Sequence, residues 1–553
     1  MNPQPPVTNM RIAGGTSSDA EAAPLVSPPT VGQRLDDIIG RVRQMEWEDW
    51  VPWLIVGLAA FLRFFWLDIK PPHFDEGING WFVDQMVKNG FYKYDPTNYH
   101  GPLHFYILFV CQTLLGRNVW AIRLPVVLAS IFAVHLTLKF EPFVGRRVSR
   151  LAALAMAVSP GFVFYGRYSI HEVWLLIFSM LFIRGLLGLW QRGTVNYLWS
   201  AGMGLTGMIL TKETYIIHVG CALIAAAMAA ISQKIAPTPD ARRVRQSWSY
   251  LDVVMIAGVG TAAIVCFYSG FFMNWPGVKG LYLTFDAWFK TGSQGAGHEK
   301  PWYYWLKLIA IYEHPIGLAL LVSLLTLYFK RISLRYLAIY GVGTLIAYSI
   351  VKYKTPWCII SIVWPLLFVF GAMLTLVPEH LRRWSYFVAG AFLAVSLGIC
   401  VRLNYFRCTT ETEDYVYVQT YNDVWKLTEP LLRLAKKDPT YYQLTGHLIR
   451  TSTYPLPWML GDFTRVGYYE HNNSPGTFDG DFLLVQEDRI AEVEAKLQET
   501  YYTEPMTIRQ YQDQSKLYFN AKVFAKIFPG RTPDFVGKPA QPQSPPQTPP
   551  PPK

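Results

Sequence analysis

Long apolar segments separated by short polar loops follow one another over residues 51–402. The segments cover approximately residues 51–67, 101–116, 119–140, 148–165, 168–190, 197–211, 213–231, 251–273, 303–329, 334–351, 356–377 and 385–402. An α-helix needs ~20 mostly apolar residues to cross the hydrocarbon core of a bilayer, and most of these segments approach that length. The pattern therefore predicts a mainly α, polytopic membrane protein, in agreement with a composition of 51% hydrophobic and 16% charged residues.

Positively charged side chains gather in the short loops between the apolar segments. The loops at 146–150, 242–245, 330–335 and 382–383 are rich in arginine, and the positive-inside rule places such loops in the cytoplasm. Membrane topology therefore explains the net charge of +11, and no nucleic acid partner is expected. The same rule puts residues 68–100, 274–300 and everything after residue 403 on the outer face.

Twelve crossings do not fit this orientation. With the amino end in the cytoplasm, residues 101–140 must cross an odd number of times, yet that length of helix reaches only roughly 60 Å, enough for two spans. We expect 101–116 or 119–140 to be re-entrant or interfacial, which gives about eleven crossings. A missed span would give thirteen, so the predicted range is 11–13 transmembrane helices.

The residues outside the apolar region have a different character. Residues 1–30 are rich in proline, serine and small residues and predict disorder, whereas 31–50 have the pattern of an amphipathic helix lying on the membrane. From 403 to 537, runs such as Tyr415–Thr420 and Phe482–Gln486 have strand character and predict a small extracytoplasmic α/β domain. Residues 538–553 predict a disordered, proline-rich tail. The six cysteines have no metal-like spacing and predict no disulfide framework.

Two adjacent acids, Asp75 and Glu76, lie in the predicted outer loop 68–100, just after the first apolar segment. Charged side chains so close to hydrocarbon are costly, so they tend to have a function. Three more polar turns on the same predicted face carry Arg167 with His171 and Glu172, then Lys212, then Lys352 with Tyr353 and Lys354. Cations at this depth can bind the oxygens of a lipid-linked phosphate, and a carboxylate can accept the proton of an acceptor hydroxyl. For each cation, anchoring of its helix by snorkelling is the alternative.

Several histidines lie close to these charges. His73 precedes Asp75 by two positions, and His100 and His104 are four apart, a spacing that can place two imidazoles on one face of a helix. A divalent metal held by these side chains with Asp75 or Glu76 is one interpretation. Gly101-Pro102 more naturally marks the start of a helix and leaves His100 outside it. Substrate contact or ordinary hydrogen bonding is therefore the favoured interpretation.

The order of these motifs resembles that of the GT-C glycosyltransferases, in particular the protein O-mannosyltransferase and lipid A aminoarabinose transferase type. The resemblance covers residues 51–402 and rests on Phe74-Asp75-Glu76-Gly77, Tyr165-Gly166-Arg167, Thr211-Lys212 and the Lys-x-Lys-x-Pro segment from Lys352. Together with His100-Gly101-Pro102-Leu103, the first two are most similar to a subgroup first noticed in archaea and labelled flippase-activity-associated. Aminoarabinose transferases have a Glu-Lys pair where this chain has His100-Gly101-Pro102.

The resemblance implies a function and roles for the candidate residues. The donor would be a polyprenyl-phosphate sugar, and the sugar would pass to a protein, lipid or glycan on the outer face with inversion of the anomeric centre. Asp75 would be the catalytic base with Glu76 beside it. The cations expected to hold the donor phosphate are Arg167, Lys352, Lys354 and Lys212. The other residues expected to contact substrate are His73, His100, His104, His171, Glu172 and Tyr353. No cofactor is implied, and a divalent metal stays open.

Two other classes of protein would also use a cationic site at the membrane surface or an outer domain. A flippase or transporter-associated protein for lipid-linked sugars needs such a cavity, but the hydropathy shows no clear internal repeat of the kind that many transporters have. A scaffold that displays the outer domain would leave Asp75, Glu76 and Arg167 without a role. The sequence therefore favours an integral membrane glycosyltransferase.

Overall fold

The computed structural model describes residues 46–98, 100–240, 244–295, 297–471 and 473–538. The predicted disorder of residues 1–30 and of the tail from 539 onward lies outside the described residues. So does the predicted surface helix, except for its last residues, where α2 (Trp47–Phe64) begins. The chain divides into two compact units, Met1–Val51 and Pro52–Lys553. Apart from the beginning of α2, all the described elements belong to the second unit.

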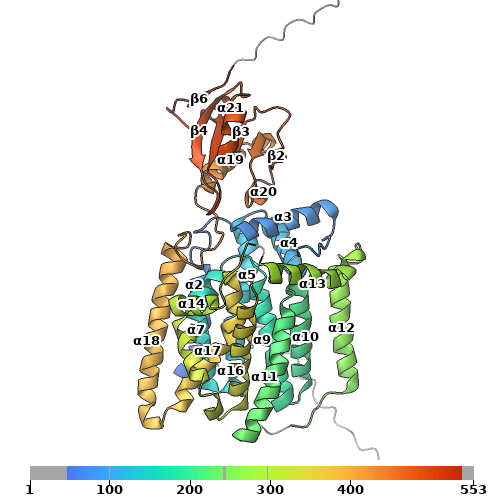
Figure 1. Cartoon of the computed structure of the whole chain (residues 1–553), viewed down its shortest axis with the longest axis vertical. Coiled ribbons are helices and arrows are strands. Elements are labelled where there is room, and N and C mark those ends of the chain that lie inside the picture. Colours follow the sequence, from blue (N-terminus) through green and yellow to red (C-terminus); the bar gives the residue numbers. More distant parts are fainter. Residues whose placement is uncertain (1–45, 99, 241–243, 296, 472, 539–553) are drawn as a thin grey trace, which may run out of the picture. The chain divides into compact units, whose positions relative to one another are not determined.

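Helices form most of the chain up to residue 401, as the apolar pattern predicted. After α2 they are α3 (Phe74–Asn89), α4 (Leu103–Leu115), α5 (Val119–Leu138), α6 (Glu141–Val144), α7 (Arg146–Val158), α8 (Pro160–Tyr165), α9 (Glu172–Gln191), α10 (Val195–Thr211), α11 (Tyr215–Ile235), α12 (Tyr250–Tyr268), α13 (Pro276–Gln294), α14 (Tyr304–Tyr312), α15 (His314–Ser323), α16 (Ile332–Ile350), α17 (Ile359–Leu376) and α18 (Arg382–Val401). Figure 1 shows the long helices side by side in one bundle, with α3 and α13 lying across their ends.

Six helical stretches of the described chain are long and apolar enough to cross a membrane by length and composition. They are Val119–Val144, Glu172–Gln191, Tyr215–Ile235, Tyr250–Tyr268, Pro356–Leu376 and Glu379–Phe406. Helices α14 and α15, bent by 120°, add a seventh if they form one broken span. This count is lower than the predicted 11–13 because other bundle helices are short or carry charge; α7 and α10, for example, have 13 and 17 residues.

Contacts between loops show at which end of the bundle each helix begins. At one end, Arg331 donates a hydrogen bond to the carbonyl of Phe143 (3.2 Å); we call this the arginine end. At the opposite end, which carries Asp75, Arg123 donates to the carbonyl of Lys70 (3.1 Å). The described chain passes between these ends through α2, α5, α7, α9, α10, α11, α12, α14 with α15, α16, α17 and α18. Six or seven of these passages are long and apolar enough to cross a membrane by length and composition, and the number of crossings stays a prediction.

Helix α4 is the segment that does not cross. Its 13 residues span about 20 Å at ~1.5 Å per residue, less than the ~30 Å of hydrocarbon. Both of its ends lie near the Asp75 end of the bundle, since His104 contacts Ser169 (3.1 Å) and Arg117, just beyond α4, pairs with Asp84 of α3 (2.8 Å). The structure therefore agrees with the expected interfacial segment in 101–140.

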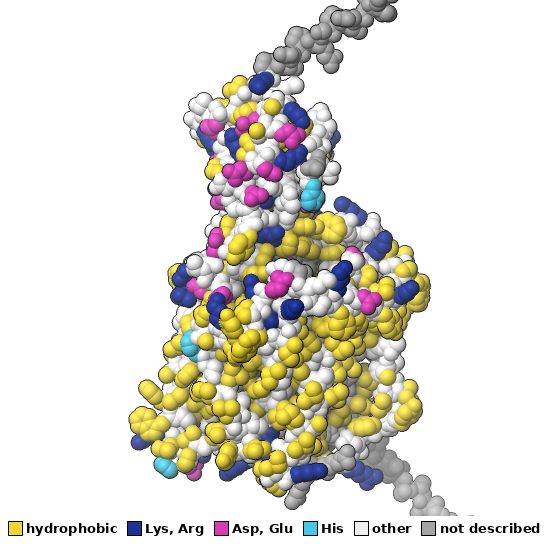
Figure 2. Space-filling view, in the orientation of Figure 1, with side chains coloured by type: hydrophobic (Ala, Val, Ile, Leu, Met, Phe, Trp, Pro, Cys, Tyr) yellow, Lys and Arg dark blue, Asp and Glu magenta, His cyan; other side chains and the backbone are white. Residues whose placement is uncertain are grey.

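The surface of the bundle is apolar where it would meet lipid. Figure 2 shows hydrophobic side chains, in yellow, spread over the flank of the helices, whereas most of the blue and magenta charges lie above and below them. Helix α12 is an example, because its Leu251 and Val259 are 64% and 56% exposed. By contrast, α17 is buried over most of its length, as expected for a helix that is hydrophobic on all sides and surrounded by others. The chain is an integral membrane protein with α17 in its core.

The C-terminal region forms the predicted small α/β domain. Its six-stranded sheet has the order β2-β1-β3-β5-β4-β6, with β1 parallel to β2 and β3 and the other neighbours antiparallel. The strands are β1 (Thr445–Ile449), β2 (Arg465–Tyr469), β3 (Phe482–Gln486), β4 (Thr500–Met506), β5 (Ser515–Asn520) and β6 (Phe535–Val536), and the long helix is α19 (Val424–Lys437). The predicted strand at Tyr415–Thr420 is wrong. This segment has no ladder beyond one bridge, between Thr420 and Arg509, and it lies against the site described next.

Candidate active site

Asp75 and Glu76 lie in the first turn of α3, so the predicted outer loop contains a helix at this point. The amide of Asp75 donates to Nδ1 of His73 (3.1 Å), and Oε2 of Glu76 accepts from the amide of His73 (2.8 Å). This reciprocal cap satisfies amides at the start of the helix. Acids in the first turn are also favoured by the helix dipole. The local sequence thus fixes the positions of both carboxylates.

The two carboxylates have different surroundings. Glu76 is fully buried, and Arg123 binds it through two hydrogen bonds (2.9 and 2.7 Å) while the amide of Ser169 donates a third (2.8 Å). Burial acts to raise the pKa of Glu76, but the charge and hydrogen bonds of Arg123 outweigh it and hold the pKa below its usual value. Glu76 is therefore an ionised, hydrogen-bonded anchor in this structure, and its oxygens are already occupied.

Arg123 is a site residue that the sequence analysis did not identify. Besides Glu76, it donates to the carbonyls of Leu67 (2.8 Å), Lys70 (3.1 Å) and Pro71 (3.1 Å). It therefore fixes the segment between α2 and α3 and the start of α3 at once. A lone arginine inside the apolar run 119–140 was the available signal, because a charge in such a run usually has a partner that compensates it.

The side chain of Asp75 is 30% exposed, and its Oδ2 lies 3.8 Å from Nδ1 of His73. His73 is held from its other side, where Nε2 lies 2.7 Å from the carbonyl oxygen of Tyr417. Burial lowers the pKa of His73, and the charge of Asp75 only partly opposes this, so the imidazole is neutral near pH 7. Arg509 of the C-terminal domain stacks 3.7 Å from the ring of Phe74, and the charge of Asp75 reaches its guanidinium.

Lys70 is a second residue that the sequence analysis passed over. Its side chain is buried, with Nζ 3.9 Å from the ring centre of Phe164 and 4.6 Å from that of Tyr168. Among the described residues its ammonium has no hydrogen-bond partner. Burial, followed by the nearby charge of Arg123, lowers the pKa of Lys70 to about 7. A buried cation that has only aromatic neighbours is suited to receive an anion.

Residues from two of the predicted polar turns come together with the His100 segment beside α3. Lys212 forms a buried ion pair with Glu172, and Nδ1 of His100 lies 3.2 Å from Glu213. The ring of His171 lies 4.6 Å from that of His100 and 4.5 Å from that of His104. Gly101 makes this approach possible, because a Cβ at its position would lie 2.2 Å from the carbonyl oxygen of Leu210. The motif His100-Gly101-Pro102 thus serves to join α4 to the turn that carries Lys212.

The histidines of this cluster are held by hydrogen bonds or ring contacts. Oγ of Ser169 lies 3.1 Å from Nε2 of His104, and Nε1 of Trp174 donates to Nδ1 (3.0 Å), so both ring nitrogens of His104 are engaged. Among the described residues, no group of three or more His, Cys, Asp or Glu side chains has an arrangement that could hold a metal ion. The geometry therefore favours the hydrogen-bonding interpretation for His104.

A small cavity lies against this cluster. Lys212, His100, Tyr353 and Trp357 line it together with Trp288 of α13, and it encloses about 50 Å³. This volume is well below the ~300–1,000 Å³ of typical small-molecule sites. A sugar phosphate would therefore fit only if side chains that line the cavity moved.

The predicted cations of the Lys-x-Lys segment lie at the edge of the site. Lys352 is exposed, and its carbonyl accepts from the amide of Lys300 (3.3 Å). Lys354 is buried, and its ammonium donates to the carbonyls of Lys300 (3.2 Å) and Val351. Burial lowers the pKa of Lys354. Of the three predicted lysines, Lys212 is the one that lines the small cavity.

Arg167 differs most from its predicted role. Its guanidinium is buried and donates to the carbonyls of Leu62 (2.9 Å), Phe65 (2.7 Å) and Trp66 (2.6 Å) at the end of α2. A cation at a helix C-terminus compensates the unpaired carbonyls and the helix dipole. In this conformation Arg167 is a cap for α2, neither a snorkelling anchor nor an open phosphate ligand.

We expect Arg167→Lys to lower the free energy of unfolding by about 2 kcal/mol, because an ammonium cannot form the same hydrogen bonds to three carbonyls as the planar guanidinium does. Donor affinity of the folded fraction should stay unchanged. Thermal unfolding in detergent and donor titration would measure the two effects. The matched control is Arg407→Lys, an arginine near the same end that is 38% exposed. Weakened donor binding without loss of stability would instead favour the predicted phosphate role.

Comparisons with known proteins agree with this architecture. Residues 99–267 match the family described as dolichyl-phosphate-mannose-protein mannosyltransferase. The structure of ArnT from Cupriavidus metallidurans bound to undecaprenyl phosphate is similar, with a TM-score of 0.59 at 15% identity over 86% of this chain and 98% of that one. The apo structure of the same protein gives a TM-score of 0.51 at 14% identity, covering 84% and 97%. No curated protein gives a significant match to the sequence.

The structural likeness covers 86% of this chain, whereas the family match is confined to residues 99–267. The predicted likeness to the archaeal subgroup is not tested by these comparisons and stays a prediction. The motif order, the mannosyltransferase match and the shared fold agree with one another. Residues 99–267 thus resemble this mannosyltransferase family, and the chain has the fold of ArnT.

Proposed function

We propose that this protein transfers a sugar from a polyprenyl-phosphate donor to an acceptor hydroxyl at the Asp75 end of the bundle. The main observation behind the proposal is that the carboxylates of two neighbouring acids, Asp75 and Glu76, have different surroundings. Glu76 is buried and bound by Arg123, whereas the side chain of Asp75 is 30% exposed and lies 3.8 Å from Nδ1 of His73. One carboxylate is thus held in place and the other is left available for proton transfer.

Asp75 would act as the general base. It would take the proton of the acceptor hydroxyl as that oxygen attacks the anomeric carbon of the donor sugar, and the lipid phosphate would leave from the opposite face in a single inverting step. His73 would orient Asp75, because the imidazole lies between Asp75 and the carbonyl of Tyr417. General-base catalysis contributes ~10²- to 10⁴-fold to rates of this kind.

The donor phosphate would be held by buried lysines. Lys212 lines the small cavity, but Glu172 already compensates its charge. Lys70 is the cation whose ammonium has only aromatic partners, so its binding to phosphate would not have to break an existing ion pair. We therefore add Lys70 to the predicted ligands Lys212 and Lys354. The undecaprenyl phosphate named with the similar ArnT structure supports a lipid phosphate as the product.

The direct test is the release of polyprenyl phosphate from a labelled polyprenyl-phosphate sugar by the purified protein. Release that depends on an added acceptor supports transfer. The acceptor can be screened among peptides, lipids and glycans. Movement of intact donor across vesicle membranes without any release would support a flippase and contradict the proposal.

Lys70 gives the proposal a pH dependence. Because the pKa of Lys70 is lowered to about 7, its ammonium form is lost as the pH rises through that value. The charges of Arg123 and Arg167 lower this pKa further, and that of Glu76 raises it. If phosphate binding needs the ammonium form of Lys70, the KM for donor should rise roughly 25-fold between pH 6.5 and 8.5, because that is the ratio of the ammonium fractions at the two pH values for a pKa of about 7. Steady-state kinetics over this range would measure it.

Lys70→Met should have a raised KM that no longer changes over this pH range. The matched control is Lys352→Met, which removes an exposed lysine close to the site and should keep the pH dependence of the natural protein. A KM that varies with pH in the same way with and without Lys70 would remove Lys70 from the phosphate site.

A further inference from the structure

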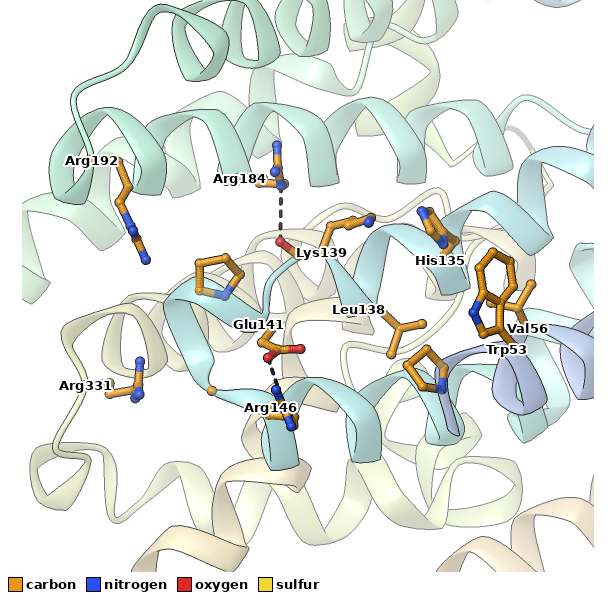
Figure 3. Close-up of a pocket in the computed structure, with 13 residues that line it drawn as sticks. Trp53, Val56, His135, Leu138, Lys139, Glu141, Arg146, Arg184, Arg192 and Arg331 are labelled. Atoms are coloured by element: carbon orange, nitrogen blue, oxygen red, sulfur yellow. Dashed lines mark hydrogen bonds and ion pairs between the residues drawn. The ribbon is translucent and has the colours of Figure 1, made fainter. Parts of the chain in front are cut away.

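A second cavity lies at the arginine end of the bundle, at the opposite ends of the helices from Asp75. Its volume is about 750 Å³, large enough for a lipid headgroup. Its walls come from α2, from the connection that joins α5 through α6 to α7, from α9, and from the loop before α16 (Figure 3). None of the residues proposed for sugar transfer lines it, so the cavity is a separate site.

The cavity is strongly cationic. Five lysine and arginine side chains line it, against the single carboxylate of Glu141. The cations are Lys139, Arg146, Arg184, Arg192 and Arg331. Figure 3 shows them coming from different helices and surrounding one space. Glu141 pairs with Arg146 (3.2 Å), so the space keeps a large excess of positive charge. Like charges that line one cavity repel one another, and an anion bound among them would relieve this repulsion.

Contacts with the backbone orient two of the arginines. Nε of Arg184 donates to the carbonyl of Lys139 (3.3 Å), and Nη1 of Arg331 donates to the carbonyl of Phe143 (3.2 Å). Each of these contacts uses one of the five N–H groups that a guanidinium carries. The guanidinium groups of Arg184 and Arg331 are therefore oriented by the protein without a ligand. Guanidinium groups can donate two parallel hydrogen bonds to the oxygens of a phosphate.

One wall of the cavity is apolar. Trp53 and Val56 of α2 and Leu138 of α5 form it, and Trp53 is 63% exposed. Neighbouring side chains on the same two helices, Leu54 and Phe132, are 52% and 45% exposed, as expected on a lipid-facing surface. Tryptophan is enriched where a helix meets the headgroup region. A ligand that contacts both this wall and the arginines must be amphiphilic, with an anionic head and an apolar tail.

We propose that this cavity binds the phosphate headgroup of an anionic membrane lipid, with its acyl or prenyl chains along Trp53 and Val56. Basic pockets between transmembrane helices are known to recognise lipid headgroups in this way. A free phosphate or nucleotide would use the cations but would gain nothing from the apolar wall. The bound lipid would neutralise the arginines and join α2, α7 and α9, so it should stabilise the bundle.

The test uses the full chain, purified in an uncharged detergent, with phosphatidylglycerol as the probe. Native mass spectrometry measures the lipid that is retained, and thermal unfolding measures the stabilisation. The double variant Lys139→Gln with Arg192→Gln removes two exposed cations from the cavity. We expect its dissociation constant for phosphatidylglycerol to rise about fivefold for each cation removed.

The matched control is Arg147→Gln. Arg147 is exposed and adjacent to Arg146 on α7, but it does not line the cavity; its removal should leave phosphatidylglycerol binding nearly unchanged. Equal weakening by control and double variant would overturn the proposal, as would equal retention of phosphatidylcholine. If inorganic phosphate at the same concentration displaces the lipid completely, the site takes free anions and the lipid assignment fails. A polyprenyl phosphate that binds more tightly than phosphatidylglycerol would support it and identify the lipid.

A second measurement does not depend on the folding of any variant. Phosphatidylglycerol with a photoreactive group in an acyl chain, close to the headgroup, should label the peptides that contain Trp53 or Leu138. Labelling confined to other segments of the bundle would contradict the site.

Discussion

Asp75→Asn should abolish sugar transfer while the protein stays folded and binds its donor. The amide has the shape of the carboxylate but cannot accept a proton, so we expect the rate to fall by ~10²- to 10⁴-fold, the usual contribution of a general base. The side chain of Asp75 is 30% exposed and its nearest ionisable contact is with His73 at 3.8 Å. Its replacement should therefore leave the free energy of unfolding nearly unchanged. Transfer rate, donor affinity and thermal unfolding are the three measurements.

The matched control for Asp75→Asn is Asp68→Asn, which makes the same chemical change at an exposed position between α2 and α3. It should keep full activity. Activity of Asp75→Asn within about threefold of the natural protein would remove Asp75 from the base role. A large loss of stability would show that Asp75 supports the fold, and the kinetic result could then not be read as loss of a base.

Glu76→Gln, unlike Asp75→Asn, should strongly lower the free energy of unfolding. Glu76 and Arg123 are both fully buried, and their ion pair is 2.7 Å long. Removing one partner of a buried pair leaves the other charge uncompensated and typically costs ~3–5 kcal/mol. The buried guanidinium of Arg123 would lose its counterion, and the carbonyls that it binds would be released together. Thermal or denaturant unfolding in detergent would measure the effect, and activity should fall with the folded fraction.

The control for Glu76→Gln is Glu379→Gln, which breaks an ion pair with Arg382 in which the glutamate is 86% exposed. Exposed pairs contribute ~0–1 kcal/mol, so this variant should behave like the natural protein. If Glu76→Gln is as stable as the control but inactive, Glu76 has a direct part in the reaction and our assignment of roles within the pair is reversed. Equal behaviour of Glu76→Gln and the natural protein would remove Glu76 from both roles.

Much of the fold was accessible from sequence because it depends on local pattern. Apolar segments of near-spanning length must become helices in a membrane, since every backbone polar group there needs an internal hydrogen bond. This constraint predicts the bundle from residue 51 to 402. Helix length alone does not decide that α4 stays at the Asp75 end, since α7 is equally 13 residues long and passes through the bundle; the contacts at both ends of α4 decide it. Alternation in runs such as Phe482–Gln486 likewise predicts the central strand β3 of the C-terminal sheet.

The candidate site was accessible only in part. The sequence identifies Asp75, Glu76, His100, Lys212 and Glu172 as candidates because they are polar residues next to apolar segments. The structure places these residues close together. It could not distinguish Asp75 from Glu76, since the two are adjacent and chemically alike. Their difference arises from Arg123, which lies 47 residues further along the chain from Glu76 and reaches only one of them.

Tertiary structure also decided how the cations are used. Arg167 stands in a turn that looks suited to phosphate, yet the end of α2 provides three carbonyls that occupy its guanidinium. Lys70 looks like an ordinary interfacial lysine, yet the rings of Phe164 and Tyr168 surround it with no hydrogen-bond acceptor among the described residues. The sequence by itself determined which segments enter the membrane and which polar residues gather at their ends, because both follow from the local cost of burying charge. Which of those charges are compensated was decided by contacts between distant helices, whose geometry no local pattern contains.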